Sequence, residues 1–407
     1  NDVLIVGGGI LGLASAWQLQ RRDPRLRVTV LEKEAAPGRH QSGHNSGVLH
    51  SGIYYRPDSL KARNCVAGRL AMVEFCQEHG VAHEVCGKVI VAVQQHELRR
   101  LDTLLQRGLA NGVRCERISP EQLADLEPHA RGVAAIHVHD TGVVDFGAVV
   151  ATLHRLVVEV GGRVITSARV VGLRDDADEV VARTTAGDFT AAWGINCAGL
   201  HADRVAKIAG TPPDIRVVPF RGEFYRLKPE AARLCNHLIY PVPDPALPFL
   251  GVHLTRQVHG DIEVGPNAVL ALAREGYRRR DVHLGDAFGT VCWPGFWRLA
   301  FRHWRAAVAE TRRSLSKRAF ARAVQRLVPA VRAEDLVPAR SGVRAQAVGR
   351  DGALIDDFLF KRGKRFLHVC NAPSPAATAA LNIGATLADM LRERTGQHTG
   401  PMAAGGE

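Results

Sequence analysis

Three glycines near the start of the chain are spaced for binding a phosphate-rich ligand. Gly7, Gly9 and Gly12 form the pattern G-x-G-x-x-G, and the acidic residue Glu32 follows 20 residues after the last of them. The first two glycines let the backbone turn tightly and approach a pyrophosphate, and the third lets a helix pack close to the preceding strand. A carboxylate at the position of Glu32 accepts hydrogen bonds from ribose hydroxyls. The spacing predicts a dinucleotide site but does not separate FAD from NAD.

A second polar loop follows this acid. Residues 41–47 read Gln-Ser-Gly-His-Asn-Ser-Gly, and they are followed by His50. Backbone N–H groups and hydroxyls in such a loop can donate along a pyrophosphate and against the edge of a flavin ring. Histidine has the side-chain pKa nearest neutrality, so His44 and His50 are candidates for a general base. This loop favours FAD over NAD.

The elements that must position these residues have the order strand, turn, helix. Residues 3–6 form an apolar, mostly β-branched run typical of a buried parallel strand, and residues 13–19 continue with helical spacing. Residues 27–31 predict a second strand that leads into Glu32. The fingerprint glycines therefore lie where a strand turns into a helix, which is the context they need. A glycine-rich turn that binds no nucleotide is the weaker interpretation.

Longer segments resemble one flavoprotein family. Residues 43–57 and 59–62 are similar to the L-2-hydroxyglutarate oxidase/dehydrogenase family of the D-amino-acid-oxidase-like superfamily, although the resemblance leads us to expect glycine at Asp58. The likeness continues in order through residues 196–203, 219–223, 236–241, 248–256, 264–270, 341–346, 354–360 and 370–378. It implies an FAD enzyme that oxidises L-2-hydroxyglutarate to 2-oxoglutarate by hydride transfer from C2 to flavin N5. Electrons would then pass to a quinone or to oxygen.

Oxidation of an alcohol beside a carboxylate needs a base and a cation. Arg344 in Gly-Val-Arg resembles the arginine with which the superfamily holds the substrate α-carboxylate, and a guanidinium fixes both the position and the plane of that group. The base candidates stay open between His50, His44 and His253. The candidates for the distal carboxylate and the pocket wall are Lys61, Arg221, Arg256, Tyr54 and Tyr55.

The expected FAD contacts come from three regions of the chain. A helix expected over residues 376–391 would aim its first N–H groups at the flavin or at a bound anion. The resemblance places Val170 near the adenine and Ala198 and Gly199 near the cofactor backbone. The complete set is Gly7, Gly9, Ile10, Gly12, Glu32, Lys33, Ser42, His44, Asn45, Ser46, Gly47, Val170, Ala198, Gly199, Pro373, Ala376 and Ala377.

These segments predict an α/β fold in which a Rossmann-like FAD-binding domain is interleaved with an α+β substrate domain carrying a mostly antiparallel sheet. We expect FAD-binding segments at residues 1–80, 146–210 and 341–394. Substrate-domain segments are expected at residues 81–145 and 211–340. Residues 395–407 predict a flexible tail.

Basic and aromatic residues are concentrated in one part of the substrate domain, residues 288–326. The whole chain has a net charge of +12, and residues 298–326 hold nine basic residues and one acid. Trp297, Phe301, Trp304 and Val308 recur at helical spacing and predict one apolar face with arginines beside it. Such a helix suits an anionic membrane surface, while packing against the protein's own core is an equally good interpretation.

Other features limit the partners. The eight cysteines show no metal-binding spacing, so we expect no metal and reduced thiols in a cytoplasmic protein that is at most peripheral on the inner face of the cell membrane. No nucleic-acid-binding motif accompanies the basic charge. The expected partners are a small dicarboxylate and a quinone or other electron acceptor. The main alternative is an amine oxidase of the same fold that acts on glycine- or sarcosine-like substrates.

Overall fold

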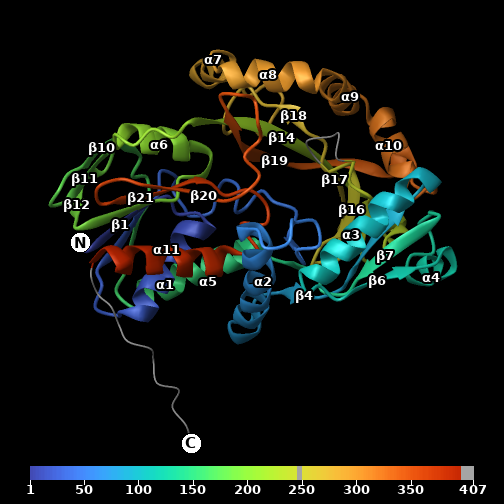
Figure 1. Cartoon of the computed structure of the whole chain (residues 1–407), viewed down its shortest axis with the longest axis horizontal. Helices are drawn as coiled ribbons and strands as arrows, with labels where there is room; N and C mark the ends of the chain where they lie inside the picture. Colours follow the sequence, from blue (N-terminus) through green and yellow to red (C-terminus); the bar gives the residue numbers. More distant parts are fainter. Residues whose placement is uncertain (245–249, 396–407) are drawn as a thin grey trace, which may run out of the picture.

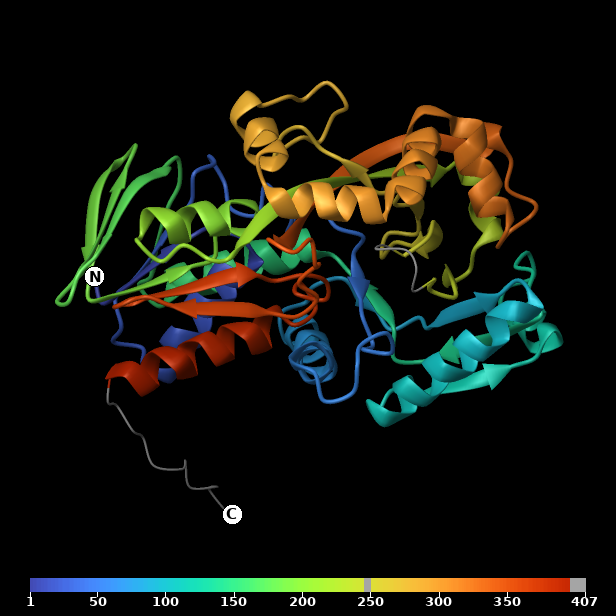
Figure 2. The ribbon, with the colours of Figure 1, turned by 45° about the horizontal axis from the view of Figure 1, so that its top comes forward.

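The computed structural model describes residues 1–244 and 250–395 of the chain. Two large sheets organise these residues, with helices packed around them (Figures 1 and 2). The predicted α/β fold class is confirmed.

The first sheet is assembled from distant parts of the chain. β1 lies between β2 and β13, and both neighbours run parallel to it. β20 is the one antiparallel strand of this sheet as described. In spatial order the strands are β20 (Leu359–Arg362), β21 (Phe366–Asn371), β13 (Trp193–Asn196), β1 (Val3–Val6), β2 (Val28–Leu31) and β9 (Arg163–Ile165).

Both faces of this sheet are covered, which explains the continuous apolar run at β1. Val3 and Ile5 pack on the side of α1 and α11, while Leu4 and Val6 pack on the side of a three-stranded meander and α6. The meander strands are β10 (Val170–Asp175), β11 (Val180–Thr184) and β12 (Gly187–Ala191). The helices around this sheet are α1 (Ile10–Arg22), α2 (Leu60–Glu78), α5 (Phe146–Glu159), α6 (Ala202–Ile208) and α11 (Ala380–Thr395).

The second sheet is mostly antiparallel, as predicted, with one parallel pair between β15 and β5. Its spatial order is β18 (Val269–Leu270), β14 (Ile215–Leu227), β17 (Ile262–Gly265), β16 (His253–Arg256), β15 (Leu238–Pro241), β5 (Lys88–Ala92), β7 (Ala134–Val138) and β6 (Cys115–Ile118). β19 (Leu336–Gly349) pairs along β14. A small sheet of β3 (Val48–Leu49), β8 (Gly142–Val144) and β4 (His83–Glu84) completes the described strands.

Helices cover the second sheet and include the predicted basic region. α7 (Leu284–Val291), α8 (Pro294–Arg302), α9 (Trp304–Leu315) and α10 (Lys317–Gln325) form a row along one side of the β14–β19 pair (Figures 1 and 2). The remaining helices are α3 (Leu98–Ala110), α4 (Pro120–Leu126) and the short 3-10 turns η1 (Gln95–Glu97), η2 (Gly199–His201), η3 (Pro229–Leu234) and η4 (Ala333–Asp335).

The structure differs from the sequence-based expectations at three places. The expected boundary at 340/341 falls inside β19, so residues 341–349 belong to the second sheet. α11 begins at Ala380 rather than Ala376, because residues 374–379 form turns instead of a regular helix. The helical spacing expected through Trp297 and Val308 is interrupted, because His303 adopts φ −118° and ψ 23° between α8 and α9.

Two further observations concern the whole described chain. Within residues 1–244 and 250–395, no helix combines the length and the apolarity needed to cross a bilayer. All eight cysteines fall in this part of the chain and carry free thiols. The tail expected at 395–407 lies outside the described residues beyond position 395.

Candidate active site

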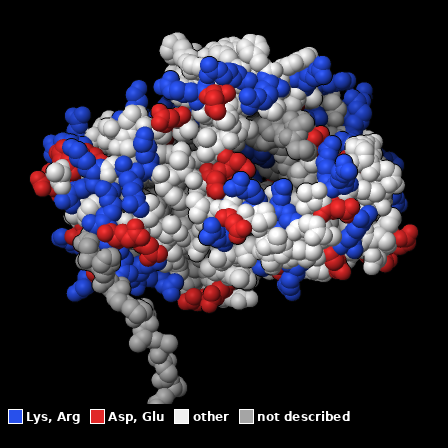
Figure 3. Space-filling model, viewed as in Figure 1, with Lys and Arg blue, Asp and Glu red and all other residues white. Residues whose placement is uncertain are grey.

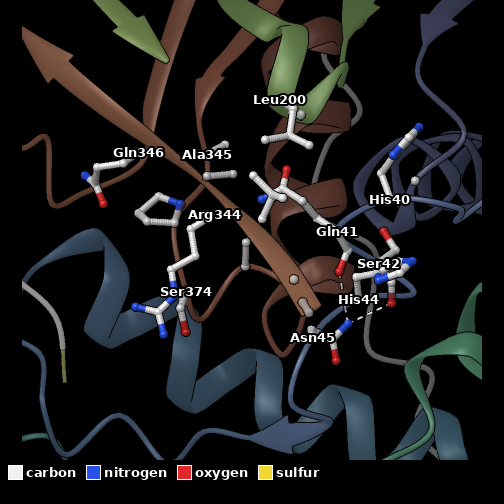
Figure 4. Close-up of a pocket in the computed structure, with 18 of the residues that line it drawn as sticks. His40, Gln41, Ser42, His44, Asn45, Leu200, Arg344, Ala345, Gln346 and Ser374 are labelled. Atoms are coloured by element: carbon white, nitrogen blue, oxygen red, sulfur yellow. Dashed lines mark hydrogen bonds between the residues drawn. The ribbon is translucent and has the colours of Figure 1, made fainter. Parts of the chain in front are cut away.

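A cavity of about 1200 Å³ runs from the β1–α1 turn to β19. A pocket for one small molecule usually measures about 300–1000 Å³, so this volume accommodates a dinucleotide together with a small substrate. In Figure 4, residues of the 40–45 loop lie on one side, and Arg344, Gln346 and Ser374 lie on the other. The cavity therefore has a cofactor-loop end and a cationic end.

The turn after β1 has room for glycine alone at two positions. Gly7 has φ +110°, and a Cβ added there would lie 2.5 Å from the carbonyl oxygen of Cys197. A Cβ added at Gly12 would lie 1.9 Å from the carbonyl oxygen of Gly7. The fingerprint glycines therefore let strand, turn and helix approach each other closely, as a pyrophosphate-binding turn requires.

Side chains from two later segments organise this turn. Glu32 is buried, and its carboxylate accepts hydrogen bonds from Gly8 N (2.8 Å) and Glu34 N (2.9 Å). Ser42 Oγ accepts a hydrogen bond from Ile10 N at the start of α1, at 2.9 Å. These contacts, the glycine cradle and the size of the cavity fit FAD, with Glu32 placed for the ribose and α1 for the pyrophosphate.

Most of the residues predicted to bind FAD line this cavity. They are Gly7, Gly9, Ile10, Glu32, Lys33, Ser42, His44, Asn45, Ser46, Val170, Ala198, Gly199, Pro373, Ala376 and Ala377. Gly12 and Gly47 do not line it. Gly12 acts through the packing described above, and Gly47 donates its N–H to Asn45 Oδ1 at 2.9 Å, which holds the loop in shape.

A lysine lies inside the group of acidic residues near this loop. Glu34, His40 and Glu275 bring ligand atoms close enough to hold a metal ion. Lys33 Nζ lies 2.7 Å from a Glu275 carboxylate oxygen and also contacts Glu34. The ammonium group of Lys33 therefore neutralises part of the negative charge of these carboxylates, as a bound metal ion would.

The cationic end brings together residues from three distant segments. His50, Arg344 and His253 all line it. His50 Nε2 lies 3.2 Å from Ser374 Oγ. His253 Nδ1 lies 2.9 Å from the carbonyl oxygen of Gly251, so Nδ1 carries the proton and Nε2 keeps a free lone pair.

Both histidines at this end are neutral at physiological pH. Burial, together with the charge of Lys88 and other cations nearby, lowers the pKa of His50 to about 3. Burial and the charge of Arg344 likewise lower the pKa of His253 to about 3. A histidine that acts as a general base must be neutral before it accepts a proton, so His50 and His253 both stay candidates for the base.

The third base candidate, His44, lies at the other end of the cavity. His44 Nδ1 lies 2.8 Å from the carbonyl oxygen of Ser341, and its ring stacks on Tyr277 at 4.2 Å between centroids. Burial lowers its pKa as well. Figure 4 shows His44 on the opposite side of the cavity from Arg344.

The other predicted substrate residues divide into two groups. Tyr54, Tyr55 and Lys61 line the cavity. Arg221 and Arg256 do not line it. Arg221 is buried in a salt bridge to Glu223 at 3.1 Å, and Arg256 donates to the carbonyl oxygen of Asn236 at 3.3 Å.

Two residues at this end were missed by the sequence analysis. Lys88 is buried at the start of β5, with its Nζ 4.4 Å from the ring centre of Tyr54 and 4.9 Å from that of Tyr240. Tyr240 lines the cavity and stacks on His253 at 3.9 Å between centroids. A lysine within an otherwise apolar strand pattern, Lys-Val-Ile-Val-Ala, was the one signal available for Lys88.

Comparisons with known proteins agree with this geometry. A family model described as FAD dependent oxidoreductase matches residues 2–390. The chain is 44% identical over 395 residues to an L-2-hydroxyglutarate dehydrogenase of Indibacter alkaliphilus, covering 97% of this chain and 99% of that protein. It is 45% identical over 401 residues to an L-2-hydroxyglutarate dehydrogenase of Escherichia coli (strain K12), covering 98% and 95%.

A solved structure shares the fold. Dithionite-reduced L-alpha-glycerophosphate oxidase from Mycoplasma pneumoniae, with FAD bound, matches with a TM-score of 0.80 and 22% identity, covering 96% of this chain and 94% of that one. At this identity the likeness is one of fold.

Proposed function

The chain belongs to the FAD-dependent oxidoreductase family, and from this membership we propose that it oxidises L-2-hydroxyglutarate to 2-oxoglutarate. The membership confirms the family resemblance and the FAD cofactor predicted from the sequence. The observation that carries the substrate proposal is the cationic end of the cavity, where Arg344 lies near the neutral imidazoles of His50 and His253.

The residues at this end have distinct roles in the proposed reaction. Arg344 holds the α-carboxylate and orients the C2–H bond. We assign the base to His50, which takes the hydroxyl proton in its neutral form beside Ser374. FAD, when bound, supplies a hydride acceptor. Tyr54 and Tyr55 wall the space in which the substrate chain lies.

The same charges argue against the amine-oxidase alternative. A glycine- or sarcosine-like substrate has one carboxylate, which Arg344 can hold, but it has no second carboxylate, and its ammonium group is repelled by the nearby Lys88. A hydroxy diacid brings two negative charges to the same region and is attracted by them.

Anaerobic reduction tests this proposal. The purified holoenzyme is mixed without oxygen with L-2-hydroxyglutarate, its D-enantiomer, or sarcosine, and the absorption of the oxidised flavin is followed. We expect rapid bleaching by the L-diacid alone. Bleaching by sarcosine and not by the L-diacid would establish the amine-oxidase function instead.

We also propose that the electron acceptor is a quinone reached at an anionic membrane surface. The support is a line of exposed apolar side chains on α7, α8 and α9, here called the apolar row. The row consists of Leu284, Phe288, Trp297, Phe301, Trp304, Val308 and Leu315. Phe301 is 73% exposed and Trp304 57% exposed, whereas Trp293 is buried and donates its indole N–H to Val348.

Basic side chains accompany the apolar row. In Figure 3, Lys and Arg gather beneath the uncharged tips along the row of helices α7–α9. Exposed arginines there include Arg298, Arg302 and Arg305. Aromatic rings at headgroup depth with cations beside them suit an anionic bilayer, to which each cation adds about 1 kcal/mol.

Vesicle sedimentation tests the membrane contact. We expect the holoenzyme to sediment with phosphatidylglycerol vesicles at low salt and to be released at high salt. The double substitution Phe301→Ser and Trp304→Ser abolishes sedimentation, whereas Leu70→Ser, at a residue 56% exposed on α2, leaves it unchanged. Equal sedimentation of both variants would contradict the proposal.

A further inference from the structure

Lys88 is a charged residue in an apolar layer of the second sheet. It is 1% exposed and begins β5, whose next residues on the same face, Ile90 and Ala92, belong to a hydrophobic cluster with Leu238 and Tyr240. Within the described residues, the contacts of Lys88 Nζ are with the rings of Tyr54 and Tyr240, and it forms no hydrogen bond or salt bridge. Burial of an ammonium without a carboxylate is costly, so a partner from outside the chain would stabilise it.

The groups nearest to Lys88 border the cavity. Its Nζ lies over the rings of Tyr54 and Tyr240, and both tyrosines line the cavity wall. Aromatic faces stabilise a cation only in part. The hydroxyl of Tyr54 is buried and has no hydrogen-bond partner in the described structure. A cation and a tyrosine whose hydroxyl has no partner therefore lie together beside the cavity.

Lys61, the other lysine at this end, is in a different situation. Its Nζ lies 2.9 Å from a carboxylate oxygen of Asp356, and it also lies over the ring of Tyr55. Its charge is already matched by a carboxylate of the protein. A second substrate carboxylate therefore gains less from Lys61 than from Lys88, whose charge has no such partner.

Building on the proposed oxidation of a hydroxy diacid, we propose that the distal carboxylate is recognised by the cluster of Lys88, Tyr54 and Tyr240. Lys88 supplies the positive charge from behind the tyrosine rings, and Tyr54 Oη donates a hydrogen bond. Arg344 holds the α-carboxylate, so the two cations define the length of the substrate as well as its charge. Lys88 is therefore a residue that sets specificity for a diacid over a monoacid.

Proton binding supports the same assignment. Burial lowers the pKa of Lys88 to about 7, so the ligand-free site holds this lysine partly neutral. A carboxylate bound nearby favours the ammonium and raises its pKa, so diacid binding takes up a proton near neutral pH. The titratable groups beside Lys88 are His50, Tyr54, Cys65, Tyr240 and His253, and Lys61 and Arg344 are further cations that act on the same His50.

Substrate preference in Lys88→Met is the first test, with L-2-hydroxyglutarate and L-2-hydroxybutyrate as substrates. Methionine keeps the length and loses the charge. We expect kcat/KM for the diacid to fall by at least about tenfold relative to the monoacid, the scale of one buried charge contact. We expect Lys88→Arg to retain part of the preference for the diacid over the monoacid, and Lys61→Met to retain all of it. Retained preference in Lys88→Met, or its loss in Lys61→Met instead, would overturn the proposal.

Binding of glutarate is the second test and needs no turnover. Changes in the flavin absorption spectrum on titration give the Kd of glutarate, which is compared with the Kd of butyrate. In the wild type, we expect glutarate to bind more weakly as the pH rises above 7, and this dependence to be lost in Lys88→Met. If Lys88→Met does not fold, Tyr54→Phe, which removes the hydroxyl alone, replaces it. We expect Tyr54→Phe to weaken the binding of glutarate and to leave the binding of butyrate unchanged. Equal effects on the two affinities would refute the assignment.

The two proposals fail separately. If the wild type is not reduced by L-2-hydroxyglutarate, the proposed oxidation falls, and the glutarate and butyrate affinities still decide whether Lys88 recognises a second carboxylate. If the wild type is reduced by L-2-hydroxyglutarate and Lys88→Met retains full diacid preference, the oxidation stands and the role of Lys88 is refuted.

Discussion

Replacing Arg344 with lysine tests whether carboxylate geometry, rather than charge alone, controls this enzyme. Both side chains carry one positive charge, but a guanidinium offers two parallel N–H donors to a carboxylate and an ammonium does not. One charge-assisted hydrogen bond contributes about 1.5–3 kcal/mol, so its loss lowers kcat/KM for L-2-hydroxyglutarate by about 10- to 150-fold. The pKa of His50 and His253 stays low, because the positive charge that helps to lower it remains.

The assay is stopped-flow reduction of the flavin under anaerobic conditions. Arg256→Lys is the matched control, because Arg256 lies outside the cavity and bonds to the carbonyl oxygen of Asn236. We expect the control to stay within about threefold of the wild type, and both variants to retain FAD. If Arg344→Lys matched the wild type while Arg256→Lys was impaired, the assignment of the α-carboxylate to Arg344 would be wrong.

Three further predictions concern the base, the cofactor turn and a buried ion pair. His50→Asn lowers the rate constant of flavin reduction by about 100-fold with a small change in substrate Kd. A larger fall of this rate constant in His253→Asn would assign the base to His253. Gly7→Ala yields protein depleted of FAD, because the added Cβ would meet the carbonyl oxygen of Cys197. Flavin absorbance after gel filtration measures the retained FAD. The control Gly210→Ala retains FAD, because nothing lies within 4 Å of a Cβ added there. Arg274→Met leaves the buried Asp203 without its partner and lowers the free energy of unfolding by about 3–5 kcal/mol at neutral pH. Burial raises the pKa of Asp203, but the hydrogen bond and charge of Arg274 outweigh it and hold the pKa below its usual value. The difference in the free energy of unfolding between wild type and Arg274→Met should therefore shrink as the pH falls into the range where carboxylates are protonated. A difference that stays constant with pH would contradict this account.

Local sequence patterns predicted the strand-turn-helix unit at the cofactor-loop end because that unit depends on local geometry. The close approaches at Gly7 and Gly12 occur within one strand-turn-helix unit, so the spacing of the glycines reports them directly. Val3 to Val6 likewise form a continuous apolar run because both faces of β1 are covered.

The cationic end could be predicted only in part, because strand register decides which cations face the cavity. In the β14–β19 ladder, Arg344 is opposite Phe220, so Arg221 lies on the other face of the sheet. In β16, Arg256 is three residues from His253 and therefore also faces away from it. A sequence shows that these arginines exist but not which face carries them.

The cluster around Lys88 depends on contacts that are further apart in sequence. Tyr240 reaches Lys88 because β15 pairs with β5 in parallel, with Tyr240 opposite Ile90. Neither strand contains a pattern that specifies this pairing. A buried lysine in such a strand is informative only after its neighbours are known.

The same pairing logic links the cofactor loop to the substrate arginine. His44 Nδ1 lies 2.8 Å from the carbonyl oxygen of Ser341, and Arg340 donates to the carbonyl oxygens of Gly43 and Asn45 at 3.2 and 3.1 Å. These contacts come from β19, the strand that carries Arg344 three residues after Ser341. The loop predicted to contact the flavin and the arginine proposed to hold the substrate are therefore connected through a few residues of one strand. Because hydride transfer is sensitive to small displacements of the reacting atoms, we expect a change in this part of β19 to affect the position of the loop and of Arg344 together.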